Sequence, residues 1–363
     1  MTIKLAMRIA AVLVTLTLIS VALPVALAQQ GPIIRQPGPI IRQPGPIIRQ
    51  PGPLVLRPML GPSINFEAKL SPELTERATN LRVYRLAPPR LTDSFFDVFV
   101  EVGLEGFRGE RMQVGDMIAM SDDQSNFAMF DRASGLLSFS MGMADQIDER
   151  PGELPGGREA RAIARDFLTR NELWPRDEKQ VTNPYIGHIR SASFNPETGE
   201  EGKAMLQMLT VYFGRMVDDT EVIGSASKMI VQIGDGGKVV GAGINWREIG
   251  QALPISARQL RSSDQIMQDI QTLLRREFVQ GESLAVKQLG LFYYDNGGEY
   301  IQPVIGFEAQ VRAGEMPPYS YFGQVALLTS PPELVGPEPL SREAREMLQQ
   351  SPQELAPPTK PGD

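Results

Sequence analysis

Residues 211–240 read VYFGRMVDDTEVIGSASKMIVQIGDGGKVV, and this stretch decides the class of fold. Its apolar runs are short and rich in Val and Ile, as is typical of β-strands. Asp235-Gly236-Gly237 separates two of these runs and predicts a hairpin of Lys228–Ile233 with Lys238–Trp246. Farther upstream, Arg158–Leu173 carries apolar residues at helical spacing. A helix followed by antiparallel strands indicates an α+β unit.

The same order of elements occurs on both sides of this central unit. Helices are predicted from Thr92 to about Gly103 and over Asp264–Val279, the second capped by Ser262 or Ser263. The other predicted strands are Arg111–Met120, Asn126–Asp131, Leu136–Met141, Tyr185–Phe194, Ala204–Gly214, Ala285–Tyr294, Tyr300–Val311 and Tyr319–Thr329. We therefore expect an α+β fold made of helix-plus-antiparallel-sheet modules in tandem.

Shifts in composition divide the chain of 363 residues into six segments. A signal peptide (1–28) and a repeat stalk (29–62) are expected first. An N-terminal module (63–150), the central module (151–255) and a C-terminal module (256–330) follow, and a Pro-rich tail (331–363) ends the chain.

The first segment has the features of a signal peptide. Lys4 and Arg8 precede an apolar run from Ile9 to Leu23, and Ala26-Leu27-Ala28 supplies the small residues for cleavage after Ala28. An uncleaved membrane anchor is the alternative for this run. No later segment is apolar enough to cross a bilayer. The sequence therefore predicts an exported protein, whether periplasmic, bound at the cell surface or secreted.

Residues 31–58 repeat a unit of seven residues, as GPIIRQP three times and then GPLVLRP. Two prolines and a glycine in each unit exclude a helix, so an extended, polyproline-like stalk is expected. Residues 1–62 contain six of the 36 basic residues and none of the 43 acidic ones. We expect this basic stalk to be a spacer or a tether to anionic envelope polymers or lipid headgroups. The tether candidates are Arg35, Arg42, Arg49 and Arg57.

Three features of the central unit occur together: the Ala-rich helix over Glu159–Leu173, the string Asp218-Asp-Thr-Glu-Val-Ile-Gly224, and the strands around Asp235-Gly236-Gly237. In this combination the unit resembles a PepSY-type module. Such modules occur in metalloprotease propeptides and in extracytoplasmic bacterial regulators. The resemblance implies binding or inhibition of a protein, and it brings no universal catalytic residues.

Composition removes most catalytic chemistry. The chain has no Cys and one His, which excludes disulfides, thiolate nucleophiles and a zinc site with two His ligands. Ser225-Ala-Ser-Lys228 matches the S-x-x-K string of penicillin-recognising serine enzymes, but strand-forming residues flank it and the partner strings are missing. His188 lies in a predicted strand, which favours a structural or surface role. An acidic body without a P-loop argues against nucleic acid.

Acidic clusters are the remaining candidates for chemistry. They are Asp122-Asp123, Asp145 with Asp148 and Glu149, and Asp218-Asp219 with Glu221. Paired carboxylates can bind Ca²⁺ or hydrolyse glycosides, but adjacent acidic residues in turns usually only solvate the turn. We therefore predict no metal and no cofactor, and keep an exported carboxylate-dependent hydrolase as the alternative function.

The predicted hairpin is also the predicted contact for a partner. It is apolar on both faces, so it needs cover from its own helix and from a neighbouring module or a partner. Gly241 and Gly243 would let another backbone approach closely. The partner-binding candidates are Met229, Val231, Val239, Gly241, Gly243 and Trp246. The sequence thus predicts a non-enzymatic exported protein that binds or regulates an envelope protein or peptide.

Overall fold

The computed structural model describes residues 61–104, 107–122, 126–143, 146, 153–192, 202–314 and 316–335. The predicted signal peptide, the repeat with its four tether arginines and most of the tail lie outside these residues. The described chain divides into two compact units. Unit 1 holds the described residues of 83–253 and 293–301, and unit 2 holds those of 61–82, 254–292 and 302–335. None of the described helices is long and apolar enough to cross a membrane.

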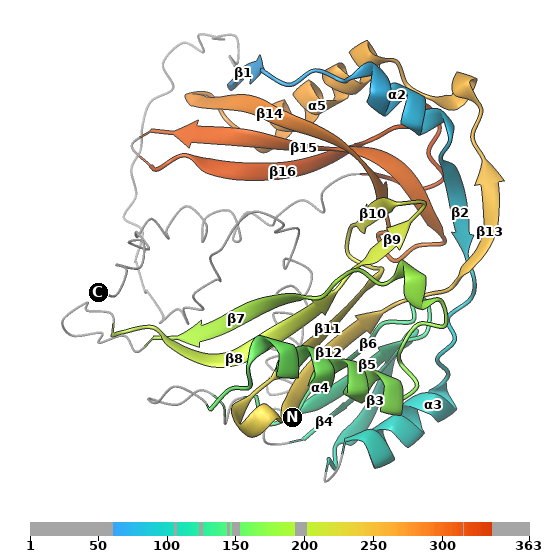
Figure 1. Ribbon diagram of the computed structural model, residues 1–363, viewed down its shortest axis with the longest axis vertical. Helices are drawn as coiled ribbons and strands as arrows, with labels where there is room; N and C mark the ends of the chain where they lie inside the picture. Colours follow the sequence, from blue (N-terminus) through green and yellow to red (C-terminus); the bar gives the residue numbers. More distant parts are fainter. Residues whose placement is uncertain are drawn as a thin grey trace, which may run out of the picture. The chain divides into compact units, whose positions relative to one another are not determined.

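Unit 1 is built on an antiparallel sheet of eight strands in the order β3-β4-β5-β6-β12-β11-β8-β7 (Figure 1). Their bounds are β3 (Glu110–Val114), β4 (Met117–Ser121), β5 (Phe127–Asp131), β6 (Leu137–Ser140), β7 (Tyr185–Ser191), β8 (Met205–Phe213), β11 (Lys228–Ile233) and β12 (Val239–Asn245). The predicted hairpin is β11 with β12, in which Val231 lies opposite Ala242. On its other side, β12 pairs with β6, and Phe139 lies opposite Ala242. Strands from segments 63–150 and 151–255 therefore share one sheet.

Two helices of unit 1 pack in one hydrophobic cluster with the sheet. Helix α3 (Asp93–Val98) continues as a π-helix over Phe99–Gly103, and α4 spans Gly157–Arg170. The helical members of the cluster are Phe96, Phe99, Val100, Ala160, Ala164, Phe167 and Leu168. Burying a large apolar side chain such as Phe96 or Leu168 contributes about 1.5–3 kcal/mol to the stability of the fold. This packing stabilises helices that would be too short to persist on their own in water. Both helices confirm the predictions for these two parts of the chain.

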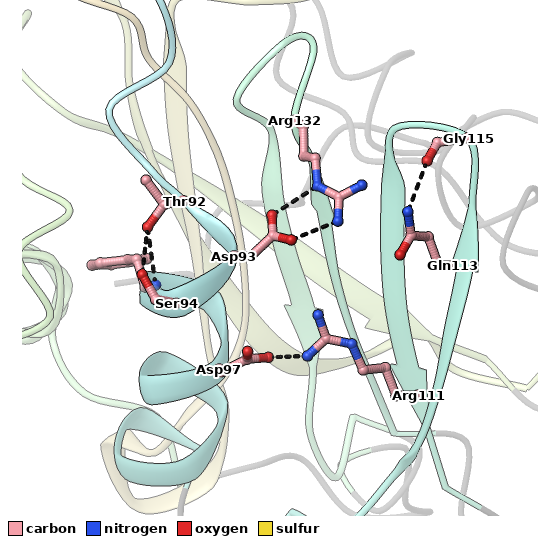
Figure 2. Close-up of polar contacts among 9 residues, drawn as sticks. Thr92, Asp93, Ser94, Asp97, Arg111, Gln113, Gly115 and Arg132 are labelled. Carbon is pink, nitrogen blue, oxygen red and sulfur yellow. Dashed lines mark hydrogen bonds and ion pairs between the residues drawn. The ribbon is translucent and has the colours of Figure 1, made fainter.

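Polar contacts fix α3 at its N-terminus and against strand β3 (Figure 2). The Thr92 side chain accepts the N–H of Phe95 at 3.2 Å, which is the cap that the sequence predicts. Arg132 donates to both carboxylate oxygens of Asp93, at 2.7 and 2.5 Å, and these hydrogen bonds lower the pKa of Asp93. Arg111 of β3 pairs with Asp97 on the next turn. The helix is thereby oriented on the edge of the sheet.

The single strand predicted over Arg111–Met120 is wrong. The structure has two strands there, β3 and β4, joined by a turn at Gly115 and Asp116. Gly115 has a φ of +60°, which glycine adopts without the steric cost of a Cβ. The Gly-Asp pair was the local signal for this hairpin.

Shorter strands of unit 1 lie outside the large sheet. They are β9 (Arg215–Val217), β10 (Thr220–Ile223), β2 (Arg82–Leu86) and β13 (Ile249–Pro254). Hairpin β9–β10 follows β8 directly, and Val222 of β10 lies opposite Tyr293, at the end of β14 (Glu282–Tyr294), in parallel pairing. Tyr84 of β2 lies opposite Ile301, near the start of β15 (Tyr300–Ala313). These short pairings position the site described below.

Unit 2 has strands in the order β1-β14-β15-β16, with helices α2 and α5. Strand β1 (Ser63–Phe66) runs parallel to β14, and β16 (Tyr319–Ala326) runs antiparallel to β15. Helix α2 spans Pro72–Thr79, and α5 spans Ser263–Glu277, with Ile266, Ile270, Leu273 and Leu274 buried. Ser262 is the N-cap of α5. The described residues therefore form a strand-rich α+β fold, as predicted.

Candidate functional site

A pocket with a volume of about 360 Å³ lies in unit 1, beside the turn between β9 and β10. Three aspartates line it: Asp177, Asp218 and Asp219. Lys179 is the basic residue in the lining, and Met216, Val217 and Ile249 supply apolar surface. The pocket therefore combines a net negative rim with an apolar wall.

The turn that carries two of these aspartates has an uncommon backbone. Asp218 and Asp219 have φ angles of +48° and +57°, in the left-handed region that usually takes glycine. Two consecutive positive φ values suit the twist of a two-residue hairpin turn, and Asp tolerates them better than most residues. The register supports this, since Val217 lies opposite Thr220. This uncommon backbone therefore holds two exposed aspartates at consecutive positions of the turn, and both line the pocket.

Two tyrosines hold the Asp218 carboxylate. The hydroxyl of Tyr84 donates to Oδ2, and the hydroxyl of Tyr293 donates to the same oxygen at 3.1 Å. The two rings meet edge to face with centroids 5.7 Å apart, and both tyrosines are buried. Among the described residues, none bonds to Oδ1. Asp218 is therefore an exposed anion with a fixed orientation and an oxygen that can accept from a ligand.

The third carboxylate comes from the segment before β7. Asp177 accepts the N–H of Lys179 at 3.2 Å and the Gln180 side-chain amide at 3.1 Å, and so caps the short 3₁₀-helix Glu178–Gln180. Val181 then bridges to Arg215 at the start of β9. This pairing brings Asp177 to the same pocket as the β9–β10 turn.

A buried polar cluster lies directly behind the hairpin. Arg215 is 0% exposed, donates to Ser227 Oγ at 2.9 Å and to the Arg247 carbonyl at 2.6 Å, and stacks on the Trp246 ring at 4.0 Å. Burial lowers its pKa to about 10, while the charges of Asp295, Glu248 and Asp177 act in the opposite direction. Arginine still carries its charge at neutral pH. Because Arg215 is the first residue of β9, these buried contacts hold the start of that strand in place.

Asp295 is the carboxylate of this cluster. It accepts from Ser227 Oγ at 2.5 Å and from the Gly297 N–H at 2.9 Å. Burial raises the pKa of Asp295, and these hydrogen bonds oppose the rise. Ser227 has both its donor and an acceptor position occupied, by Asp295 and Arg215. Its hydroxyl is therefore a structural link and is not set up as a nucleophile.

Lys228 is the second buried cation. It is 4% exposed, and its Nζ donates to the Gly224 carbonyl at 2.9 Å. Burial lowers the pKa of Lys228 to about 8, although the Asp295 charge acts to raise it. Ser225, Ala226 and Ser227 lie in the bend before β11, and Lys228 is the first residue of that strand, so Ser225 is not at a helix N-terminus as the penicillin-recognising chemistry requires.

The structure places the partner-binding candidates inside unit 1. Met229 and Val231 are 0% exposed and pack in the cluster with α4. Gly241 and Gly243 lie opposite Gln232 and Ile230 in the centre of the sheet, with β6 on their other side. Val239 and Trp246 are partly buried against the same cluster. Strand pairing on both sides and the helix on one face remove this hairpin from the surface expected for a docking site.

The other sequence candidates are scattered. His188 lies exposed on β7, away from the pocket lining. Asp122 binds Asn126, whereas Asp123, Asp145, Asp148 and Glu149 lie outside the described residues, as do the four tether arginines. Only the Asp218-Asp219 cluster reaches the pocket. Within the described ranges, no group of three or more His, Asp or Glu side chains is placed to hold a metal ion.

Sequence reasoning missed Tyr84, Asp177 and Tyr293 as neighbours of Asp218, and Asp295 as the partner of Ser227. One local signal was available, because Asp218-Asp219 separates two short β-prone runs and so marks a two-residue hairpin. No local pattern joins Tyr84 to Asp218, since 134 positions separate them.

Comparison with solved structures finds similar chains. No protein-family model and no curated protein matches the chain. A solved structure of an uncharacterized protein from Eubacterium rectale is similar, with 8% sequence identity and a TM-score of 0.42, over 70% of this chain and 85% of that one.

Proposed function

We propose that this chain is an exported, non-enzymatic protein that binds an envelope protein or peptide, and that the pocket receives a basic group of that partner. The observation that carries this proposal is the Asp218 carboxylate. The hydroxyls of two buried tyrosines orient it in an exposed turn, and Asp219 and Asp177 line the same pocket. A cation that enters finds charge and acceptors already in place, so little ordering entropy is lost on binding.

The other elements of the proposal come from the sequence. A signal peptide directs export, and the repeat stalk separates the folded part from its attachment. The central PepSY-like segment (151–255), whose strands share one sheet with those of 63–150, belongs to the part that binds the partner. Since the β11–β12 hairpin is buried, the proposed contact moves from that hairpin to the pocket. The function itself, binding without turnover, is unchanged.

A carboxylate-dependent hydrolase remains the second candidate, because the same aspartates line the pocket. A glycosidase needs a general acid whose pKa is raised by burial, opposite a second carboxylate that stays ionised. Asp218 and Asp219 are neighbours on one exposed turn. This arrangement supports binding of a cation better than it supports a divided acid–base pair.

Binding and turnover separate the two candidates. The full chain is titrated with a library of short peptides that differ in net charge, and is screened in parallel for hydrolysis of peptides, glycans and esters. We expect basic peptides to bind, and to bind about tenfold more weakly to Asp218→Asn and Asp219→Asn. Asp116→Asn, in the exposed β3–β4 turn, is the matched control. Turnover that is lost in Asp218→Asn or Asp219→Asn would instead establish the hydrolase.

A further inference from the structure

The chain carries a basic segment of its own that suits this pocket. Residues 31–58 repeat a seven-residue unit and present Arg35, Arg42, Arg49 and Arg57 without a single acidic residue. Prolines and glycines occupy much of the remaining repeat, so each arginine stands between residues that cannot form an ion pair with it. The repeat is therefore a series of guanidinium groups spaced seven or eight residues apart, with no acidic residue to compensate them.

The pocket matches a guanidinium in charge and in hydrogen bonding. Arginine has five donors in a planar fork and no acceptor, so it needs several acceptor oxygens in fixed positions. Asp218 offers its Oδ1 in an orientation set by the two tyrosines, and Asp219 adds a second carboxylate to the lining of the same pocket. Met216 and Ile249 give the apolar wall that the Ile pair and proline of a repeat unit can contact.

We propose that the pocket of one copy of this protein binds an arginine-bearing unit of residues 31–58 of a second copy. The inference rests on the proposed function and names its partner. Each chain presents this pocket once, whereas the repeat provides four arginines. A chain that bound only its own repeat would bind one arginine-bearing unit and leave the other three unbound. Repetition of the unit favours exchange between copies, since linked weak sites gain affinity when several are engaged.

A peptide titration tests the contact itself. The protein is the full chain with Arg35, Arg42, Arg49 and Arg57 all changed to Gln, which removes its own ligand and leaves the pocket unaltered. The probe is a synthetic peptide of residues 31–51, and the control peptide has Gln at each arginine. We expect the arginine peptide to bind at least about tenfold more tightly than the control. Asp218→Asn or Asp219→Asn, added to this protein, should remove the difference, and Asp116→Asn should keep it.

Sedimentation of the unaltered full chain tests exchange between copies. We expect association that increases with protein concentration and weakens with salt, and that is lost in the fourfold Arg→Gln chain and in Asp219→Asn. A chain that stays monomeric at every concentration, while the peptide binds the fourfold variant, would overturn the exchange between copies. Equal binding of the arginine and glutamine peptides would overturn the repeat as ligand.

The two proposals fail in different ways. If unrelated basic peptides bind in a manner that depends on Asp218 while the repeat peptide does not, this inference is wrong and the proposed function stands. If no basic peptide of either kind binds, both are wrong. Circular dichroism of Asp218→Asn and Asp219→Asn shows whether each variant has kept its fold. Because the two variants change different carboxylates of the pocket, each tests the binding site independently of the other.

Discussion

At the scale of single residues, the polar side chains of unit 1 fall into two groups with opposite environments. Asp218 and Asp219 are exposed at the surface. Arg215, Lys228 and Asp295 are buried, where an ionised group is costly unless partners surround it. The exposed pair lines the pocket for which we propose binding, and the buried group contacts the residues around the hairpin that carries this pair.

Lys228 makes stability depend on pH. Its pKa falls from 10.5 in the unfolded chain to about 8 in the fold, so between these values the unfolded chain binds more protons. The free energy of unfolding should therefore rise by about 2 kcal/mol from pH 8 to pH 10. Urea unfolding at a series of pH values measures this rise.

Two variants test whether Lys228 causes this rise in the free energy of unfolding. Lys228→Met should remove most of it, because Arg215, whose pKa burial lowers to about 10, adds only a small rise close to pH 10. Lys238→Met, at an exposed position of the β11–β12 turn, should preserve the rise. The comparison stops near pH 10 because burial raises the pKa of Tyr212 to about 12, and its unfolded form ionises from pH 10 upward with the opposite effect on stability. A rise that persists in Lys228→Met would show that another group titrates.

Gly224 is needed for a reason that Gly115 does not share. A Cβ at Gly224 would lie 2.1 Å from the Asp295 carbonyl oxygen, and the φ of +119° is itself unfavourable. At Gly115 the φ is +60° and no atom lies within 4 Å of the added Cβ. We expect Gly115→Ala to cost about 1 kcal/mol and Gly224→Ala more than about 3 kcal/mol, since backbone cannot move aside. Equal losses in urea unfolding would mean that the close approach relaxes freely.

At the scale of elements, the start of α5 shows how a side chain sets a boundary. Ser262 Oγ accepts the Gln265 N–H at 3.3 Å, and Gln265 Oε1 accepts the Ser262 N–H at 2.9 Å. This reciprocal pair is a capping box, and it decides between the two serines that the sequence left open.

The cap gives a direct test in unit 2. Ser262→Ala should lower the free energy of unfolding by about 1 kcal/mol, because the Gln265 N–H loses its acceptor. Ser263→Ala lies at the first helical position and should change stability little. Thermal unfolding followed by circular dichroism compares the two. If Ser263→Ala proved the more damaging variant, the capping box would not be the device that starts α5.

At the scale of the whole molecule, the repeat and the folded part should be independent in stability. Pro62 is buried next to β1, so a deletion has to stop before it. Removing residues 29–58 from the chain should leave the thermal midpoint unchanged at low protein concentration, since sparse Ile pairs between prolines cannot bury much surface. The same deletion should abolish the proposed association between copies. A midpoint lower by several degrees would show that the repeat packs on the fold.

Local sequence patterns were enough to predict helices α3, α4 and α5 and the central hairpin of this protein, whereas helix α2 was not predicted. The apolar stripe of α4, the cap before α3 and the Asp235-Gly236-Gly237 turn are local patterns, and local patterns set which backbone conformation a segment prefers. Tertiary structure alone decided that β6 pairs with β12, which turned the predicted docking hairpin into the middle of a sheet. It also decided that Tyr84 and Tyr293 meet at Asp218. These neighbours are distant in sequence, and their meeting depends on how whole strands pack, so no spacing along the chain encodes it.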